Sequence, residues 1–304
     1  MNPLLSRDPR LPDGLGATLP IPLNAQQAID FPALEGLLKR MEPVDFIRLV
    51  NSEIGVRDGK AYAGMVSFIR EVLPKPTKII ESLPSTETRD VVRYCASRAE
   101  ATRDLPLPDA WLVRPPVSRD VTLAGVIAHL RSVAESTECP VVAVMTGLTL
   151  EGRSRRQLVE AIADHPNIAG MMLTGAQALT WPRHKSLRVW VTGDTAILPM
   201  FAMGCDAVIS QLAVAFPKKL KQIAETARFG AWAESRMALE PLFHLMQHLE
   251  ELPSPAGIKT ILSHLSHCEP HLRLPHTGLA ASERDALYAD LAKLELNQTA
   301  TEPR

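Results

Sequence analysis

The sequence is poor in aromatic residues and cysteines, and it carries almost no net charge. Aromatic residues make up 5% of the 304 residues, and the formal net charge at pH 7 is -1. A chain without an excess of positive charge has no field that draws it to nucleic acid or to an anionic membrane. We therefore expect neither nucleic acid nor a membrane as a partner.

Disulfide frameworks, spanning helices and a leader peptide are also not indicated by the sequence. The four cysteines (Cys95, Cys139, Cys205 and Cys268) have no CxxC spacing, which predicts reduced thiols in a chain of this length. The longest apolar runs, such as 140–145 and 197–203, are too short to cross a bilayer. The stretch MNPLLSRDPRLPDGLG has no apolar core behind a basic end, unlike a signal peptide. A soluble, cytoplasmic protein is the expectation.

Short apolar runs alternate with longer segments in which apolar residues recur at helical spacing. This alternation is typical of an α/β protein with a parallel sheet and crossover helices. Eight such units favour a closed (β/α)8 TIM barrel, and the lack of a GxGxxG after the first strand argues against a dinucleotide-binding fold. The predicted strands cover 17–19, 45–50, 78–80, 110–113, 141–144, 168–171, 188–191 and 207–209.

After the eighth predicted strand the pattern is helical only. The predicted helices cover 217–229, 231–249, 257–267 and 282–294. No low-complexity tract or linker separates them from the preceding part of the chain. We therefore predict a barrel over 1–215 and C-terminal helices packed on it over 216–304, in a single structural domain.

Several stretches resemble one known family. CPVVAVMTGLTLEGRSRRQLVEAIADHPNIAGMMLTG (139–175), VTGDTAILPMFAMGCDAVIS (191–210), PSPAGIK (253–259) and LRLPHTGLA (272–280) occur in the order and spacing of its motifs. The chain thus resembles the dihydrodipicolinate synthase/N-acetylneuraminate lyase family, and the matches cover most of 111–294. The resemblance implies a TIM barrel with a C-terminal helical appendage, and homo-oligomers, either dimers or tetramers.

The resemblance also implies a class I aldolase, in which a lysine at the end of the sixth strand forms a Schiff base with a 2-oxo acid. Alignment without gaps places Met172 at that lysine and Val144 at the proton-relaying tyrosine of the fifth strand. A thioether cannot form an imine, and valine carries no transferable proton. Schiff-base activity is therefore expected to be lost or replaced, unless a lysine from elsewhere, such as Lys185, substitutes. No cofactor and no metal are expected.

Other polar residues are predicted at the carboxyl ends of the strands, where barrel enzymes place their chemistry. Ser52, Glu53, Glu81 and Arg114 are the candidate ligand-binding residues. Arg114 could hold a small-molecule carboxylate through two hydrogen bonds, with a glutamate as acid or base. The alternative is that Arg114 and a glutamate form an ion pair that fills the space a substrate once occupied.

Two further polar groups have structural interpretations. Asp194 is expected to cap the N-terminus of a helix. His244 and His248 are one helical turn apart, which makes a metal site conceivable, but a zinc site needs three or four converging ligands. Histidines that lie on the surface or pack between helices are the favoured interpretation.

Three functions remain open from the sequence. The first is a lyase of carbon–oxygen or carbon–carbon bonds that acts on a 2-oxo acid or a sugar-acid-like ligand without an imine. The second is a non-catalytic homologue that binds a metabolite or a partner protein. The third is a conventional aldolase whose lysine lies at another position.

Overall fold

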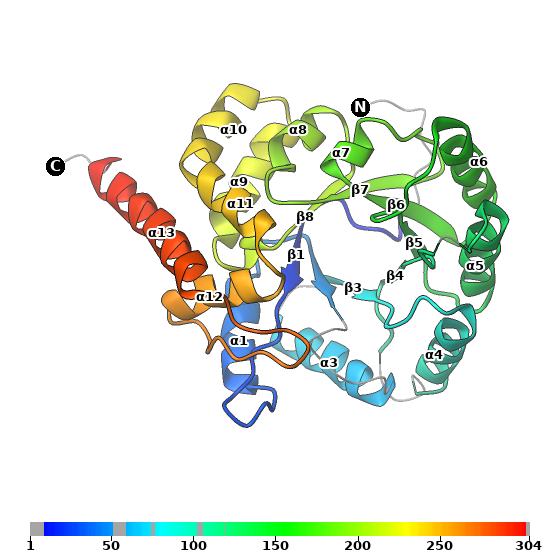
Figure 1. Cartoon of the computed structure of the whole chain (residues 1–304), viewed down its shortest axis with the longest axis horizontal. Coiled ribbons are helices and arrows are strands. Elements are labelled where there is room, and N and C mark those ends of the chain that lie inside the picture. Colours follow the sequence, from blue (N-terminus) through cyan, green and yellow to red (C-terminus); the bar gives the residue numbers. More distant parts are fainter. Residues whose placement is uncertain (1–8, 51–58, 74–76, 102–105, 119, 302–304) are drawn as a thin grey trace.

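Eight parallel strands form a closed barrel in the computed structural model, which describes residues 9–50, 59–73, 77–101, 106–118 and 120–301. Each strand pairs with the next along the chain, and β8 pairs with β1 (Figure 1). The predicted TIM barrel is therefore confirmed. The strands are β1 (Gly14–Leu19), β2 (Phe46–Leu49), β3 (Lys78–Ser82), β4 (Ala110–Val113), β5 (Val141–Val144), β6 (Ile168–Thr174), β7 (Arg188–Thr192) and β8 (Ala207–Ser210).

Helices between the strands surround the barrel, as Figure 1 shows. They are α1 (Phe31–Arg40), α3 (Gly59–Val72), α4 (Thr88–Ala101), α5 (Leu123–Glu135), α6 (Gly152–Ala163), α7 (Gly175–Ala178), α8 (Ile197–Ala202) and α9 (Pro217–Arg228). Sequential helices from α3 to α6 contact one another, and α9 contacts both α8 and β1. The last of these helices thus packs against the first strand, at the point where the barrel closes.

The local sequence accounts for these helices. In α5, the Thr122 hydroxyl accepts a hydrogen bond from the Gly125 amide, which satisfies one of the free donors of the first turn. Val126, Leu130 and Val133 recur at spacings of four and three residues and are buried against the barrel. One apolar stripe and one cap thus set both the position and the facing of the helix.

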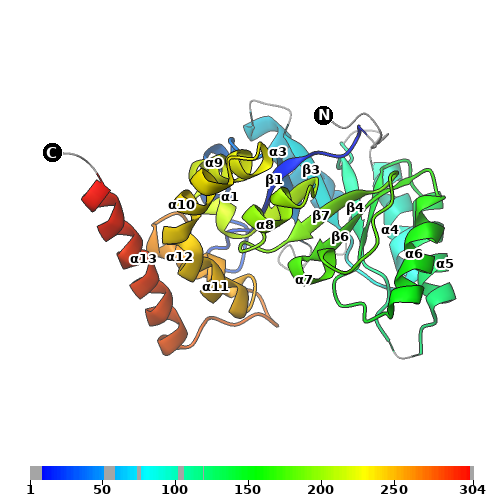
Figure 2. The ribbon, with the colours of Figure 1, turned by 90° about the horizontal axis from the view of Figure 1, so that it is seen from above.

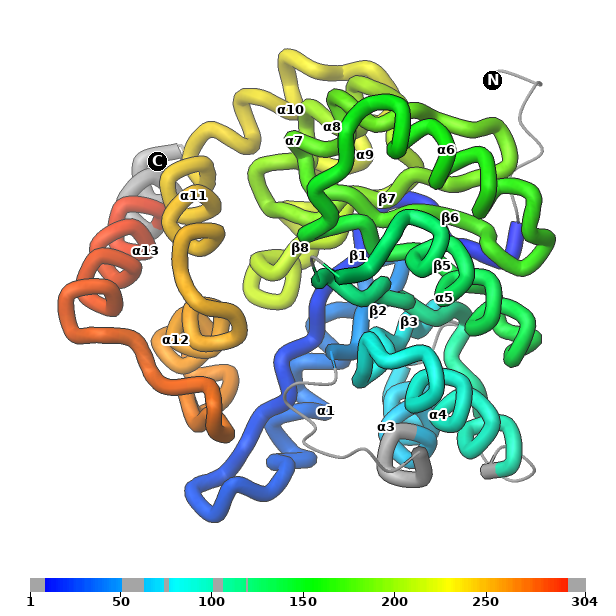
Figure 3. Tube along the Cα trace, turned by 45° about the vertical axis from the view of Figure 1, so that its right-hand side comes forward, coloured from blue at the N-terminus to red at the C-terminus, as the bar shows by residue number. Residues whose placement is uncertain are grey.

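A second group of helices lies beside the barrel, and α13 forms its outer edge in Figures 2 and 3. The group comprises α10 (Trp232–Leu239), the 3₁₀ turn η2 (Glu240–Leu242), α11 (Phe243–Glu251), α12 (Ala256–His264) and α13 (Ala281–Thr301). The single helix predicted over 231–249 was wrong. Pro241 has no amide hydrogen to donate, and the chain passes through η2 between α10 and α11 at this point.

The strand residues divide into two layers according to the side of the barrel that they face. The smaller apolar cluster fills the barrel interior and includes Phe46, Ile80, Leu112, Val144 and Met172. Their neighbours along the strands belong to the larger cluster between barrel and helices. Because side chains alternate along a strand, this division fixes which residues reach the mouth at the carboxyl ends of the strands.

All four cysteines are free, as the absence of CxxC spacing predicts. Among the described residues, no helix is both long enough and apolar enough to cross a membrane.

Candidate ligand site at the mouth of the barrel

The residues aligned with the lysine and the tyrosine of the family lie side by side in the barrel. Val144 of β5 pairs with Met172 of β6, and each side chain is 2% exposed within the interior cluster. Residues paired in a parallel sheet point to the same face. This wall of the mouth is therefore apolar, and neither side chain can form an imine or transfer a proton.

On β5 and β6, the two strands that form this wall, the structure describes no lysine. Among the described lysines, Lys78 alone is on a barrel strand, and it is the first residue of β3, at the end opposite to the mouth. Its ammonium is 2.8 Å from Asp109. Lys185 lies in the connection before β7, also at that opposite end. Lys185, the displaced lysine considered from the sequence, is therefore not at the mouth.

Arg114 directly follows β4 and continues its inward-facing positions. Ala110 and Leu112 face the interior, so the next inward position is Arg114. Val113 pairs with Ala143, which places Arg114 at the level of Val144. Its side chain is exposed, and no described carboxylate forms an ion pair with it. The ion pair between Arg114 and Glu81 that the sequence allowed is absent.

A second arginine, Arg48 of β2, faces the same mouth and was not among the predicted site residues. Phe46 faces the interior, so Arg48, two residues later, does too. Its Nε donates a hydrogen bond of 3.2 Å to Ser82 Oγ of β3. Burial, and then the positive charge of Arg114, lower the pKa of Arg48 to about 10, so it stays charged at neutral pH. A single arginine within the apolar strand FIRL was the available sign.

The C-terminal segment closes one side of the mouth. Thr18 of β1 pairs with Arg48 and lines a cavity of about 20 Å³ together with Gln211, Ser254 and Pro255. A space of this size holds about one water molecule. The helices after the barrel thus narrow the mouth at β1 and β8, whereas Arg48 and Arg114 lie on its β2–β4 side.

Glu81 was predicted as a ligand residue at the mouth, and the structure places it elsewhere. Its neighbours Ile80 and Ser82 face inward, so Glu81 faces α4. The carboxylate is fully buried, accepts a hydrogen bond from the Tyr94 hydroxyl, and pairs with Arg98 Nη2 at 3.2 Å. Burial raises the pKa of Glu81, and Arg98 opposes that rise. Glu81 therefore belongs to the packing between β3 and α4.

Ser52 and Glu53 lie outside the described residues. Of the four candidate ligand residues, Arg114 is thus the one that the structure places at the mouth, on the same side of the barrel as Arg48 and Ser82.

Asp194 does not cap α8, the helix that follows it, but its carboxylate does accept a hydrogen bond at the start of the 3₁₀ turn η1 (Leu212–Val214). The N-cap of α8 is Ala196, without a side-chain hydrogen bond. Asp194 Oδ1 instead accepts hydrogen bonds from Ser210 Oγ and, at 3.0 Å, from the Leu212 amide. Burial raises the pKa of this carboxyl to about 6, partly offset by those hydrogen bonds. Asp194 therefore ties the loop after β7 to the turn after β8.

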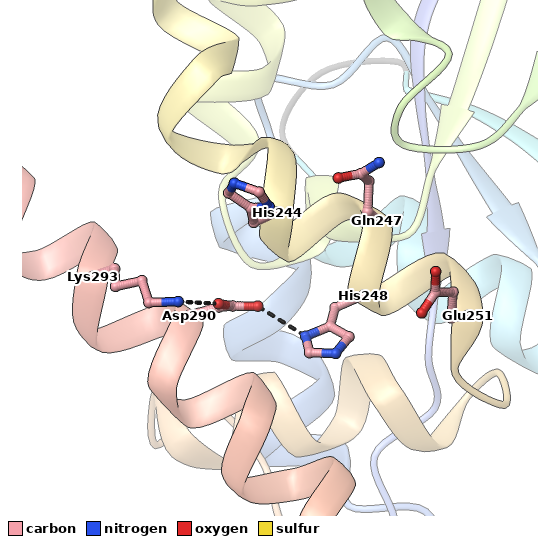
Figure 4. Close-up of a pocket in the computed structure, with 6 residues that line it drawn as sticks. All are labelled: His244, Gln247, His248, Glu251, Asp290 and Lys293. Carbon is pink, nitrogen blue, oxygen red and sulfur yellow. Dashed lines mark hydrogen bonds and ion pairs between the residues drawn. The ribbon is translucent and has the colours of Figure 1, made fainter.

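His244 and His248 line a pocket of about 330 Å³ between α11 and α13 (Figure 4). His248 Nδ1 is 2.9 Å from Asp290 Oδ2, and Lys293 Nζ is 3.0 Å from Asp290 Oδ1. In Figure 4 the side chain of His244 points away from that of His248. No group of three or more metal-binding side chains occurs among the described residues. His248 thus links α11 to α13 through Asp290, and His244 is exposed on the surface, which are the two roles favoured from the sequence.

The inward-facing polar side chains at the mouth therefore donate hydrogen bonds, and they include no group that readily transfers a proton. On the strands, the inward positions nearest the mouth carry no Asp, Glu, His or Lys within the described ranges. Two guanidinium groups supply fixed positive charge, and guanidinium is the side chain best suited to grip a carboxylate through two parallel hydrogen bonds. The arrangement suits an anionic ligand held against an apolar wall.

Comparisons with known proteins agree on one family. Residues 65–294 match the model of the dihydrodipicolinate synthetase family. Two curated relatives are 4-hydroxy-tetrahydrodipicolinate synthases. The one from Leuconostoc citreum is 25% identical over 279 residues, which cover 88% of this chain and 93% of that protein. The one from Limosilactobacillus fermentum is 28% identical over 282 residues, covering 89% and 88%.

Solved structures show the same fold. The 4-hydroxy-tetrahydrodipicolinate synthase of Methylacidiphilum fumariolicum SolV superimposes with a TM-score of 0.80 at 21% identity, covering 95% of this chain and 97% of that chain. Dihydrodipicolinate synthase from Thermotoga maritima gives a TM-score of 0.81 at 19% identity, covering 94% and 99%. The barrel and its C-terminal helices are thus shared over nearly the whole length.

Proposed function

The chain belongs to the dihydrodipicolinate synthetase family, and we propose that it binds a small carboxylate at the barrel mouth without Schiff-base chemistry. Such a ligand would be a 2-oxo acid or a sugar-acid-like molecule. The observation that carries the proposal is the pairing of Val144 with Met172 in the interior, with Arg114 at the same level. A guanidinium that can bind a carboxylate, that of Arg114, thus accompanies the replacement of the imine-forming lysine by Met172.

The proposal favours binding over catalysis. The curated relatives of this chain are named as synthases. The resemblance to the family implies that the synthase reaction proceeds through an imine. Here the lysine and tyrosine positions hold a thioether and an isopropyl group, and Glu81, the acid or base considered from the sequence, pairs with Arg98 away from the mouth. A lyase that works without an imine is the second candidate, favoured by the family match over residues 65–294. Its acid or base would have to lie outside the inward positions of the strands nearest the mouth, which carry no Asp, Glu, His or Lys in the described ranges.

Binding to carboxylates tests the proposal directly. A thermal-shift screen of 2-oxo acids and sugar acids identifies ligands that stabilise the protein, because a ligand of the folded state raises the melting temperature. Titration calorimetry then compares the native chain with Arg114→Ala. A hydrogen-bonded charge contact contributes about 1.5–3 kcal/mol, so the variant should bind roughly tenfold to a hundredfold more weakly.

Arg156→Ala provides the matched control. Arg156 is an exposed arginine on α6, so its removal changes the net charge as Arg114→Ala does but leaves the mouth intact. The control should bind like the native chain. If no 2-oxo acid or sugar acid stabilises the protein, or if both variants weaken binding equally, the proposal is wrong.

A further inference from the structure

The mouth holds two positive charges where the family resemblance implies an imine and a proton relay. Arg48 rises from β2 and Arg114 follows β4, with β3 between them. Neighbouring strands are about 4.8 Å apart, so the two backbones are roughly 10 Å apart across the mouth. The two side chains therefore enter the mouth from separate strands, near enough for the charge of Arg114 to act on Arg48.

The orientation of Arg48 leaves its two terminal guanidinium nitrogens available to a ligand. Nε donates to Ser82 Oγ at 3.2 Å, which holds the plane of the guanidinium near β3. The two terminal nitrogens make no hydrogen bond or ion pair with any described side chain. A guanidinium presents its terminal nitrogens as a fork that matches one carboxylate. Arg48 can thus take one carboxylate.

Arg114 provides a second, independent grip nearer to solvent. Its side chain is exposed, at the level of Val144, and it likewise forms no ion pair with a described carboxylate. Two like charges that face one another without a counter-ion repel, and the charge of Arg114 indeed acts on the pKa of Arg48. A ligand with one negative charge would leave part of this repulsion in place.

We propose that Arg48 and Arg114 together bind one small dicarboxylate, one carboxylate to each guanidinium. This inference rests on the proposed function and adds to it the charge of the ligand. A single phosphate group is the less suitable occupant, because the two arginines start from strands roughly 10 Å apart rather than from one loop. Val144 and Met172 then contact the carbon chain between the carboxylates.

The test compares each diacid with its half-amide, which has the same shape and one charge fewer. Malonate, succinate and glutarate are titrated by calorimetry beside their half-amides and beside inorganic phosphate. The diacid that fits best should bind at least about tenfold more tightly than its half-amide, the lower end expected for one charge-assisted contact. In Arg114→Ala, the preference should fall below about threefold, since only one cationic anchor remains.

Arg48 variants complete the test. Arg48→Met removes the charge and should abolish the preference, whereas Arg48→Lys keeps a positive charge and should retain part of it. If Arg48→Met does not fold, Arg114→Ala decides alone, because Arg114 is exposed. Arg156→Ala should keep the full preference.

The outcomes separate this inference from the proposed function. Three results would each overturn the dicarboxylate inference while carboxylate binding stands. They are equal affinity for a diacid and its half-amide, tighter binding of phosphate than of any diacid, and a preference for the diacid that survives Arg114→Ala. Absence of binding by diacids and by 2-oxo or sugar acids alike would overturn both.

Discussion

Replacing Arg98 by methionine should destabilise the protein strongly, because it leaves a buried carboxylate without its counter-ion. Both Arg98 and Glu81 are fully buried, and Arg98 Nη2 lies 3.2 Å from Glu81 Oε2. Breaking a buried pair by removing one partner costs about 3–5 kcal/mol. The remaining partner of Glu81 would be the Tyr94 hydroxyl, which donates one hydrogen bond.

The loss should depend on pH in a definite direction. In the native chain, burial raises the pKa of Glu81 and Arg98 lowers it, so Arg98→Met should raise the pKa further. A carboxyl whose folded pKa exceeds its unfolded pKa supports folding below the unfolded pKa, and that support disappears as pH rises through the folded pKa. Arg98→Met should therefore be least destabilised in mild acid and most destabilised above neutral pH.

Urea unfolding at about pH 5 and about pH 8 measures the loss of unfolding free energy in Arg98→Met and its dependence on pH. Arg93→Met is the matched control, since Arg93 is exposed on the same helix. The double variant Glu81→Gln/Arg98→Met should recover much of the stability at the higher pH, because no buried charge remains. Carboxylate binding at the mouth should persist in it. An Arg98→Met loss no larger than that of Arg93→Met, or one unchanged by pH and by Glu81→Gln, would refute the assignment of Glu81 to the core.

Two further predictions concern Asp194 and assembly. The pKa of Asp194 is raised to about 6, so its stabilising contribution is present below about pH 4 and is lost as pH rises through 6, by roughly 3 kcal/mol in all. Asp194→Asn should flatten this part of the curve of unfolding free energy against pH, and an unchanged curve would contradict the raised pKa. The chain should form a dimer or tetramer, and light scattering that gave the 33.3 kDa monomer at micromolar concentrations would exclude this.

The strands and the fold could be predicted because buried parallel strands have short, nearly continuous apolar runs. The predicted limits 110–113 and 141–144 are those of β4 and β5. Gap-free alignment assigned the lysine and tyrosine positions of the family to Met172 and Val144, and these two residues do pair, although the register of β5 and β6 shifts by one residue between Val141 and Val142.

The side-chain arrangement at the mouth was harder to predict. Ending the third strand at Ile80 placed Glu81 at the mouth, but β3 continues to Ser82, and alternation turns Glu81 toward α4. Its partner Arg98 lies 17 positions away, a contact that no local pattern encodes. The same alternation would have identified Arg48, because Phe46 is two residues before it on the inward face.

Reduction with borohydride in the presence of pyruvate, followed by intact mass measurement, tests the central claim most directly. An imine between pyruvate and a lysine is reduced to a stable covalent adduct, whichever lysine forms it. Dihydrodipicolinate synthase from Thermotoga maritima, treated in parallel, serves as the comparison protein. The account predicts that this chain keeps its unmodified mass because Met172 occupies the lysine position. A single stoichiometric pyruvyl adduct, at any lysine, would contradict it.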